Sequence, residues 1–299
     1  MSLDNDRIQK SIRRVSKFLA AAPKNPTPEK VHDLRTNARR LEASVEALGL
    51  GAKRREKRLL RDLGQVRKRA GKVRDMDVFT GHLLGVPQQE DEKECAIELA
   101  EHLGVQRAKA AKKLRRTAKE LEPRMEAELK KGSKYFEKLL GRKQKQNNGP
   151  AAEASAEAMS RALELASELR SPANLDKRNL HPYRLKVKEL RYVMQLSDDA
   201  HKQKFVNNLG EVKDAIGEWH DWEELIAIAT DVLSHGSQCN LLRSLKATSD
   251  KKFERALALT NELRRTYVAA KRAGRSARRS TGDRGVSPRI LAATSAMDA

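Results

Sequence analysis

The feature that most constrains the fold is a helical period in the apolar residues, which runs along almost the whole chain. Between residues 28 and 48 the apolar positions follow one another at spacings of three or four: Val31, Leu34, Ala38, Leu41, Val45 and Leu48. This spacing places them on one face of a helix, where they can form a core. No stretch shows the sustained apolar–polar alternation that predicts a half-buried strand. The sequence therefore predicts an all-α protein.

Prolines, glycines and polar runs set the predicted helix ends. Thr27, Pro28 and Glu29 supply an N-cap, a first-turn proline and an acidic first turn for the second helix. Elsewhere we place ends where the periodicity meets a breaker residue, including Gly71 and Gly217. We expect helices over residues 4–21, 28–48, 53–70, 73–85, 91–120, 122–141, 152–170, 177–199, 201–216, 218–234 and 237–273.

The charge balance restricts the partners. The chain has 62 Lys and Arg residues against 41 Asp and Glu, which gives a net charge of +21 and a pI near 10.1. Such an excess favours a polyanionic partner. No stretch approaches the roughly 20 apolar residues that a membrane-spanning helix needs, and Cys95 and Cys239 lack the spacing of a metal site or a disulfide framework. We expect a soluble cytoplasmic protein with reduced thiols and without a membrane span.

Two motifs occur twice in the same order. VHDLRTNARRLE at 31–42 matches LHPYRLKVKELR at 180–191, 149 positions further on. LGQVRKRAGKVRDMDVF at 63–79 matches LGEVKDAIGEWHDWEEL at 209–225, 146 positions further on. The nearly constant separation predicts an internal duplication of one helical bundle, with the two copies related by a pseudo-twofold axis.

The duplication predicts where the halves begin and end. Residues 1–142 form the N-terminal half, and residues 151–274 form the C-terminal half. The polar stretch 143–150, which contains Asn-Asn-Gly-Pro, predicts a linker between them. Residues 275–299 carry small residues and scattered arginines without an apolar stripe, which predicts a flexible tail.

The first repeated motif carries a cationic stripe. His32, Arg35 and Arg39 share one helix face, and the second copy has His181, Arg184, Lys188 and Arg191 in the corresponding arrangement. Like charges at such spacings cost a helix about 0.2–0.5 kcal/mol per pair. Their repetition at matching positions indicates an anionic ligand, because arginine presents a fork of donors that fits phosphate oxygens.

The second repeated motif adds further candidate cations. Arg67 and Arg74 correspond to Lys213 and His220, and a separate basic block at 53–61 contains Arg58. Asp75 and Asp221 follow as N-caps or salt-bridge partners, and we interpret Gly71 and Gly217 as tight helix contacts or helix ends. Most other Lys and Arg residues, and half of the block at 53–61, are interpreted as a solvated surface.

Together these motifs resemble the CHAD family, the conserved histidine α-helical domain. HxxRxxxRR followed by VRDMDV, and then HxxRxxxK followed by LGxxxD, carry the resemblance over about residues 4–272. It implies one stand-alone domain of two pseudo-symmetric four-helix bundles. Basic residues of both bundles would line a central groove or pore that binds inorganic polyphosphate, and binding would target the protein to polyphosphate granules.

The candidate polyphosphate-binding residues combine both lines of reasoning. The family motifs imply His32, Arg35, Arg39, Arg40, Arg74, His181, Arg184, Lys188 and Arg191, and the repeat and charge pattern adds Arg58, Arg67 and Lys213. The chain departs from the family pattern with acids at Glu42 and Glu189 and with a histidine at His220. We expect the two glutamates to pair with nearby arginines.

Two other classes of function compete with polyphosphate binding. The net charge also allows weak nucleic-acid binding, although only 11 aromatic residues are present and none lies within the stripes to stack on bases. An enzyme acting on phosphates is disfavoured, because the sequence lacks a GxxxxGK[ST] loop and HExxH, and Asp75 and Asp77 point apart on a helix. We expect a non-enzyme without a metal or cofactor.

Overall fold

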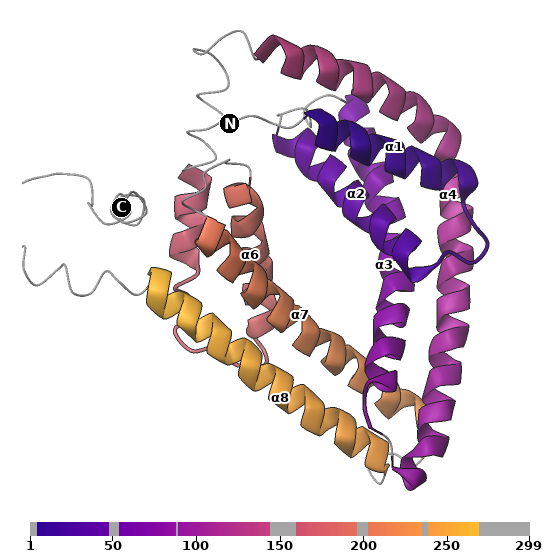
Figure 1. Ribbon diagram of the computed structural model, residues 1–299, viewed down its shortest axis with the longest axis vertical. Helices are drawn as coiled ribbons and strands as arrows, with labels where there is room; N and C mark the ends of the chain where they lie inside the picture. The colour runs from indigo at the N-terminus through magenta and orange to yellow at the C-terminus, as the bar shows by residue number, and fades with distance from the viewer. Residues whose placement is uncertain are drawn as a thin grey trace, which may run out of the picture. The chain divides into compact units, whose positions relative to one another are not determined.

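A computed structural model describes residues 5–47, 54–87, 89–143, 160–195, 203–234 and 239–268. The predicted tail and all of the predicted linker except Lys143 lie outside these residues. The labelled elements are α1 (Asn5–Ala21), α2 (Pro28–Ala47), α3 (Arg54–Leu84), η2 (Glu90–Glu92), α4 (Lys93–Lys143), α6 (Leu180–Gln195), α7 (Gln203–Val232), α8 (Asn240–Leu263) and η5 (Arg264–Val268). Residues 160–168 are also helical. All regular structure in the described ranges is helical (Figure 1), which confirms the predicted all-α class.

The chain divides into two compact units, each with its own core. One, which we call the α1–α4 unit, comprises Leu3–Asn147 and Leu225–Ser244. The other, which we call the α6–α8 unit, comprises Met1–Ser2, Asn148–Glu224 and Leu245–Ala299. The two copies of the repeated motifs fall into different units, except for Leu225 at the end of the second copy. The internal duplication itself stays a prediction from the sequence.

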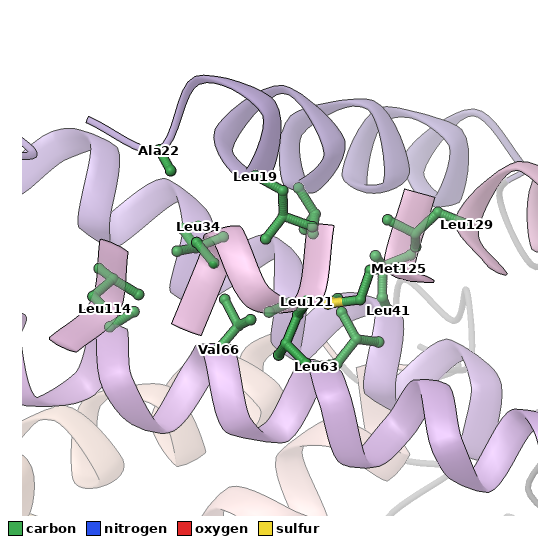
Figure 2. Close-up of a cluster of buried hydrophobic side chains, with 14 of the residues drawn as sticks. Leu19, Ala22, Leu34, Leu41, Leu63, Val66, Leu114, Leu121, Met125 and Leu129 are labelled. Carbon is green, nitrogen blue, oxygen red and sulfur yellow. The ribbon is translucent and has the colours of Figure 1, made fainter. Parts of the chain in front are cut away.

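The α1–α4 unit is a bundle of four helices. Helix α1 packs against α2 and α4, and α3 packs against the same two helices. The predicted apolar face of α2 is buried in this core, where Val31, Leu34, Ala38 and Leu41 are 0–2% exposed. Figure 2 shows Leu34 and Leu41 among buried side chains that include Leu63, Leu121 and Met125. The burial of this face fixes which side of α2 is turned to solvent.

The core of the α6–α8 unit is built from α6, α7, α8 and residues 160–168. Tyr183 is 1% exposed and packs among side chains from all of these segments, with Trp219 of α7 in the same core. Arg264, which follows α8, lies 5.9 Å from the Tyr183 ring centroid and donates to the carbonyl oxygens of Arg170, Pro172 and Ala173. These contacts hold the loop before α6 against the end of α8.

Three of the predicted helix breaks are wrong. Helix α3 continues through Gly71, α7 continues through Gly217, and α4 continues through Leu121 and the nearby Pro123. A glycine costs a helix only about 1 kcal/mol and a proline about 3 kcal/mol, and tertiary packing exceeds these amounts. On either side of Pro123, Leu121 and Met125 are both buried in the core. Helix α4 changes direction along its length (Figure 1), as a helix containing a proline often does.

None of the described helices is long and apolar enough to cross a membrane. Both cysteines are buried free thiols, Cys95 in the first turn of α4 and Cys239 just before α8. Burial, together with the neighbouring Cys239 thiol, raises the pKa of Cys95. The two side chains therefore behave as small apolar core residues.

Candidate anion-binding clusters

The start of α2 is fixed by the predicted N-cap. The amide of Lys30 donates to Oγ1 of Thr27 at 3.4 Å, and the amide of Val31 donates to the Thr27 carbonyl at 3.1 Å. The preceding loop is also held from α4, because Arg107 donates to Asn25 Oδ1 and to the Pro26 carbonyl. This anchoring sets the register of the cationic stripe on α2.

Four of the predicted arginines come together between α2 and α3. Arg35 is half-buried, and its pKa is lowered chiefly by desolvation and then by the positive charge of Arg39. Arg74 and Arg67 of α3 act in the same direction, while the carboxylate of Asp75 opposes them. We call Arg35, Arg39, Arg67, Arg74 and Asp75 the α2–α3 cluster. The cluster contains four cations and one carboxylate, so it carries an excess of positive charge that a bound anion would offset.

A further acid at the edge of this cluster engages Arg67. Nε of Arg67 donates to Oε2 of Glu42 at 2.7 Å, and the Glu42 side chain is only 15% exposed. This bond confirms the expectation that Glu42 pairs with a nearby arginine. Because the pair is partly buried, water screens the attraction poorly and part of the Arg67 charge is cancelled.

Three other predicted residues of this unit are exposed. His32 is solvent-facing, and its Nε2 lies 3.4 Å from Oγ1 of Thr36. Arg40 and Arg58 are also exposed. The structure places these side chains on the bundle surface, where they contribute charge without being packed into the α2–α3 cluster.

The start of α6 is fixed by a turn that positions the second stripe. Oδ1 of Asp176 accepts hydrogen bonds from the amides of Arg178 and Asn179, at 2.9 and 3.1 Å. Oδ1 of Asn179 accepts in return from the Asp176 amide. His181 follows in the first turn of the helix, before Pro182. A proline fits here because first-turn amides have no partner within the helix.

Arginines of α6 are anchored on backbone carbonyls of α7. Nε of Arg184 donates to the Lys213 carbonyl at 3.1 Å, and Nε of Arg191 donates to the Val206 carbonyl at 3.4 Å. A carbonyl carries no net charge, so these bonds orient a guanidinium without the charge cancellation that Glu42 provides for Arg67. The Lys213 ammonium contacts Asp214 at 2.5 Å.

Two histidines lie in contact beside Arg184. The ring centroids of His181 and His220 are 3.9 Å apart, with the ring planes at 44°. The pKa of His181 is lowered, first by desolvation and then by His220 and Arg184. Glu224 and Asp221 act in the opposite direction. We call His181, Arg184, Lys188, Arg191, Lys213 and His220 the α6–α7 cluster.

Lys188 continues the α6 face between Arg184 and Arg191. Its ammonium lies 5.8 Å from the centroid of the Tyr192 ring. The acid next to it, Glu189, accepts from Arg161 at 2.6 Å. Glu189 was expected to pair with an arginine, and this bond confirms it.

Glycines of α3 and α7 lie beneath the side chains of the neighbouring stripes. A Cβ added at Gly217 would come within 2.9 Å of Cζ of Arg184, and one at Gly210 would come within 3.1 Å of Nε of Arg191. At Gly71 the nearest atom would be Nε of Arg35, at 3.9 Å. At these three glycines the absence of a side chain leaves room for a guanidinium group of the neighbouring helix, and we call such a position a glycine seat. The interpretation of Gly71 and Gly217 as possible helix ends is wrong.

The position of Gly64 completes the correspondence between the units. A Cβ there would lie 3.6 Å from Oε1 of Glu42, just as Gly210 lies under Arg191. The repeat offset of 146 aligns Gly64 with Gly210 and Gly71 with Gly217 in the sequence, and the structure adds which stripe residue lies over each glycine.

The neighbouring acids have different structural roles. Asp75 lies near Arg35 of α2, whereas Asp77 accepts from Nε of Arg107 on α4 at 2.5 Å. They point apart, as the helical spacing predicts. Both Asp75 and Asp221 stand inside continuous helices, so the suggestion that they are N-caps is wrong. Arg107 was missed because it lies in neither repeated motif.

The fold and the clusters define an all-helical protein with two cationic surfaces of related sequence. A model of the CHAD domain matches residues 7–230, and the chain belongs to the CHAD family. The crystal structure of the CHAD domain from the plant Ricinus communis is similar, with a TM-score of 0.59 and 17% sequence identity. The match covers 90% of this chain and 94% of that one, and at this identity it shows the shared fold alone. A comparison with curated proteins gave no match.

Proposed function

We propose that the chain binds inorganic polyphosphate through the α2–α3 and α6–α7 clusters. The CHAD family is associated with polyphosphate binding. The observation that carries the proposal is the gathering of Arg39, Arg67 and Arg74 around the half-buried guanidinium of Arg35, which lies over Gly71 of α3. A solvated basic surface spreads its charges, whereas this arrangement concentrates them at a cost that a bound anion offsets.

The chemistry of the cations favours a chain of phosphates. Arginine forks bind tetrahedral oxyanions with two parallel hydrogen bonds, and repeated phosphates can engage several forks along one ligand. Among the aromatic side chains described near the clusters, Tyr183, Trp219 and Trp222 are buried and Tyr192, beside Lys188, is exposed, so successive bases would not find a row of stacking partners. These features support polyphosphate over single-stranded nucleic acid.

We further propose that the protein binds polyphosphate without cleaving it. Metal-assisted phosphoryl transfer uses carboxylates that converge on a metal ion beside the substrate. Here Asp77 is engaged by Arg107 on α4, and Asp75 lies toward Arg35 on α2. Binding of this kind would recruit the protein to polyphosphate granules in the cytoplasm, and microscopy of a fluorescent fusion in polyphosphate-accumulating cells would test that step.

Calorimetric titration tests the proposal directly. Long-chain polyphosphate is titrated at physiological salt into the wild type and into a variant with alanine at Arg35, Arg39, Arg184 and Lys188. If each cation contributes about 0.7 kcal/mol, the variant binds about 100-fold more weakly. A matched control removes four exposed cations outside both clusters: Lys112, Lys119, Lys251 and Arg255.

The control loses the same net charge and should keep most of the affinity. Duplex DNA and tripolyphosphate serve as competitors, and both should bind much more weakly than the long chain. Equal losses in the two variants, or equal affinity for DNA, would mean that binding follows net charge and would overturn the proposal. Phosphate release in the presence of Mg²⁺ would overturn the non-catalytic role.

A further inference from the structure

The contact between His181 and His220 is present in one of the two clusters. Their ring centroids lie 3.9 Å apart, beside the guanidinium of Arg184. In the other unit, His32 corresponds to His181 but is exposed next to Thr36, and the position of His220 is taken by Arg74. One cluster therefore has a fixed charge where the other has a titratable ring.

We propose that the His181–His220 pair takes up a proton when a phosphate chain binds, and that His220 is a further anion-binding residue of the α6–α7 cluster. This inference rests on the proposed function, because polyphosphate is the anion that would drive the uptake. The proton uptake makes polyphosphate bind more tightly as the pH falls. This pH dependence belongs to the α6–α7 cluster and not to the α2–α3 cluster.

The groups around the rings keep the pair from being fully charged in the free protein. Two imidazoliums in contact repel each other, and Arg184 on α6 adds a third positive charge. Two acids of α7 act against this, Glu224 and Asp221, and Nε2 of His220 lies 3.9 Å from Oε1 of Glu224.

Charged groups of α8 are paired with groups of α7 and of the loop before α6. Lys252 of α8 contacts Glu218 at 2.7 Å, and Asp250 of α8 contacts Lys177 at 2.6 Å. Each pair joins a positive and a negative group, so neither supplies a net negative charge that could stabilise a protonated histidine in place of a bound anion. Desolvation and the positive charges of His220 and Arg184 lower the pKa of His181 from its ordinary value of 6.5, which favours the neutral ring in the free protein.

A phosphate chain reverses this balance. Its negative oxygens favour imidazolium over imidazole, so the bound chain stabilises a proton taken up by the pair. Nδ1 of His181 is buried, so an anion from solvent would meet Nε2 of that ring. The pKa of the pair rises on binding. Between the free and bound pKa values the complex holds more protons than the free protein, so affinity increases as the pH falls.

Calorimetry at pH 6.0 in two buffers of different ionisation enthalpy counts the protons taken up. Long-chain polyphosphate is the ligand, because its titrating end groups are few compared with its internal phosphates. We expect uptake approaching one proton in the wild type, and affinity that increases from pH 7.5 to 5.5 by up to about tenfold per pH unit. His220→Gln should remove most of both effects.

The matched control is His102→Gln, which removes a histidine of α4 that lies in neither cluster and should leave the proton uptake unchanged. Subtracting the variant from the wild type also cancels any proton exchange of the polyphosphate itself. Wild-type binding without proton uptake, or uptake that survives His220→Gln, would overturn the inference while leaving polyphosphate binding intact. An absence of polyphosphate binding at every pH would instead overturn the proposed function.

A second measurement keeps the test independent of the variant's folding. NMR titration of the histidine rings in wild-type protein, free and saturated with polyphosphate, reports the pKa of each ring directly. We expect His181 to titrate below 6.5 when free and to shift upward in the complex. Unchanged titration curves for His181 and His220 would overturn the inference.

Discussion

The α2–α3 and α6–α7 clusters are built from residues at matching positions of the repeated motifs, but they differ in how much of their positive charge is neutralised. Arg35 and Arg184 both lie over a glycine of the neighbouring helix. Two helical turns after these arginines, the first unit has Glu42, which accepts a hydrogen bond from Arg67. The second unit has Arg191 at the matching position, and it donates to the Val206 carbonyl. One residue per unit therefore decides whether the cluster is partly neutralised or carries an additional cation.

The second difference is between a permanent and a titratable charge. The α2–α3 cluster has an arginine, Arg74, where the α6–α7 cluster has a histidine, His220, in contact with His181. The charge of the α2–α3 cluster is thus constant with pH, and Glu42 neutralises part of it. The α6–α7 cluster is more basic along α6 and responsive to pH. Four changes test whether these differences matter.

The largest effect is expected from Arg191→Glu, which gives the α6–α7 cluster the acid that the other cluster has. It changes the local charge by two units and removes the bond to the Val206 carbonyl. We expect polyphosphate affinity to fall by about 10- to 30-fold, which is about 1.4–2 kcal/mol. Calorimetric titration measures it. Affinity within twofold of the wild type would show that Arg191 lies outside the binding surface.

The reciprocal change, Glu42→Gln, should strengthen binding. It releases Arg67 from a partly buried ion pair and removes a negative charge near the ligand. We expect about a threefold to fivefold gain in affinity, and a matched control, Glu189→Gln, should change affinity less because Glu189 is exposed and pairs with Arg161. Equal gains in the two variants would indicate an effect of net charge alone.

A smaller effect is expected from alanine at the glycine seats, where Gly217→Ala and Gly71→Ala should differ in stability and in polyphosphate affinity. A methyl group at Gly71 fits at an ordinary distance, so that variant should gain about 0.5–1 kcal/mol of stability from better helix propensity. At Gly217 it displaces the Arg184 guanidinium and its bond to the Lys213 carbonyl. We expect little gain in stability and a twofold to threefold loss of polyphosphate affinity.

Chemical denaturation and titration of both alanine variants measure this contrast. Because the displaced atoms belong to the end of a flexible side chain, both variants should fold. A Gly217→Ala protein that is stabilised as much as Gly71→Ala, with unchanged affinity, would show that Arg184 does not depend on its seat.

The smallest effect concerns the pH dependence of stability without ligand. The pKa of His181 is lower in the folded protein than in the unfolded chain, so the unfolded chain binds more protons below pH 6.5. This group therefore makes the protein less stable as the pH falls through that value. Thermal unfolding at pH 7.5 and 5.5 should show a larger decrease in Tm for the wild type than for His181→Gln. A decrease of the same size in both proteins would contradict the lowered pKa.

The sequence predicted the parts of the site that depend on helix register. The Thr27 cap and the buried face of α2 follow from local patterns, and they determine which side His32, Arg35 and Arg39 occupy. The pairing of Glu42 with an arginine was predictable because it breaks a repeated cationic pattern. All of these are consequences of spacing along a single helix.

The features that were missed depend on contacts between helices. A glycine seat beneath Arg184 looks like a helix breaker when α7 is considered alone, and only the neighbouring α6 side chain explains it. The bond from Arg107 to Asp77 joins residues 30 positions apart, without a shared motif. The contact between His181 and His220 likewise requires α6 and α7 to be placed side by side.

The measurement that tests the central claim most directly is the salt dependence of polyphosphate binding in four proteins. These are the wild type, Arg35→Gln/Arg39→Gln, Arg184→Gln/Lys188→Gln, and the combination of all four changes. If both clusters bind the phosphate chain, each pair of changes should lower the affinity and reduce the log–log salt slope, by about 0.7–0.9 for each phosphate that the variant no longer neutralises. The combined variant should show the largest reduction in both. A wild-type slope and affinity in the combined variant would contradict the account, because the two clusters would then be ordinary solvated surface.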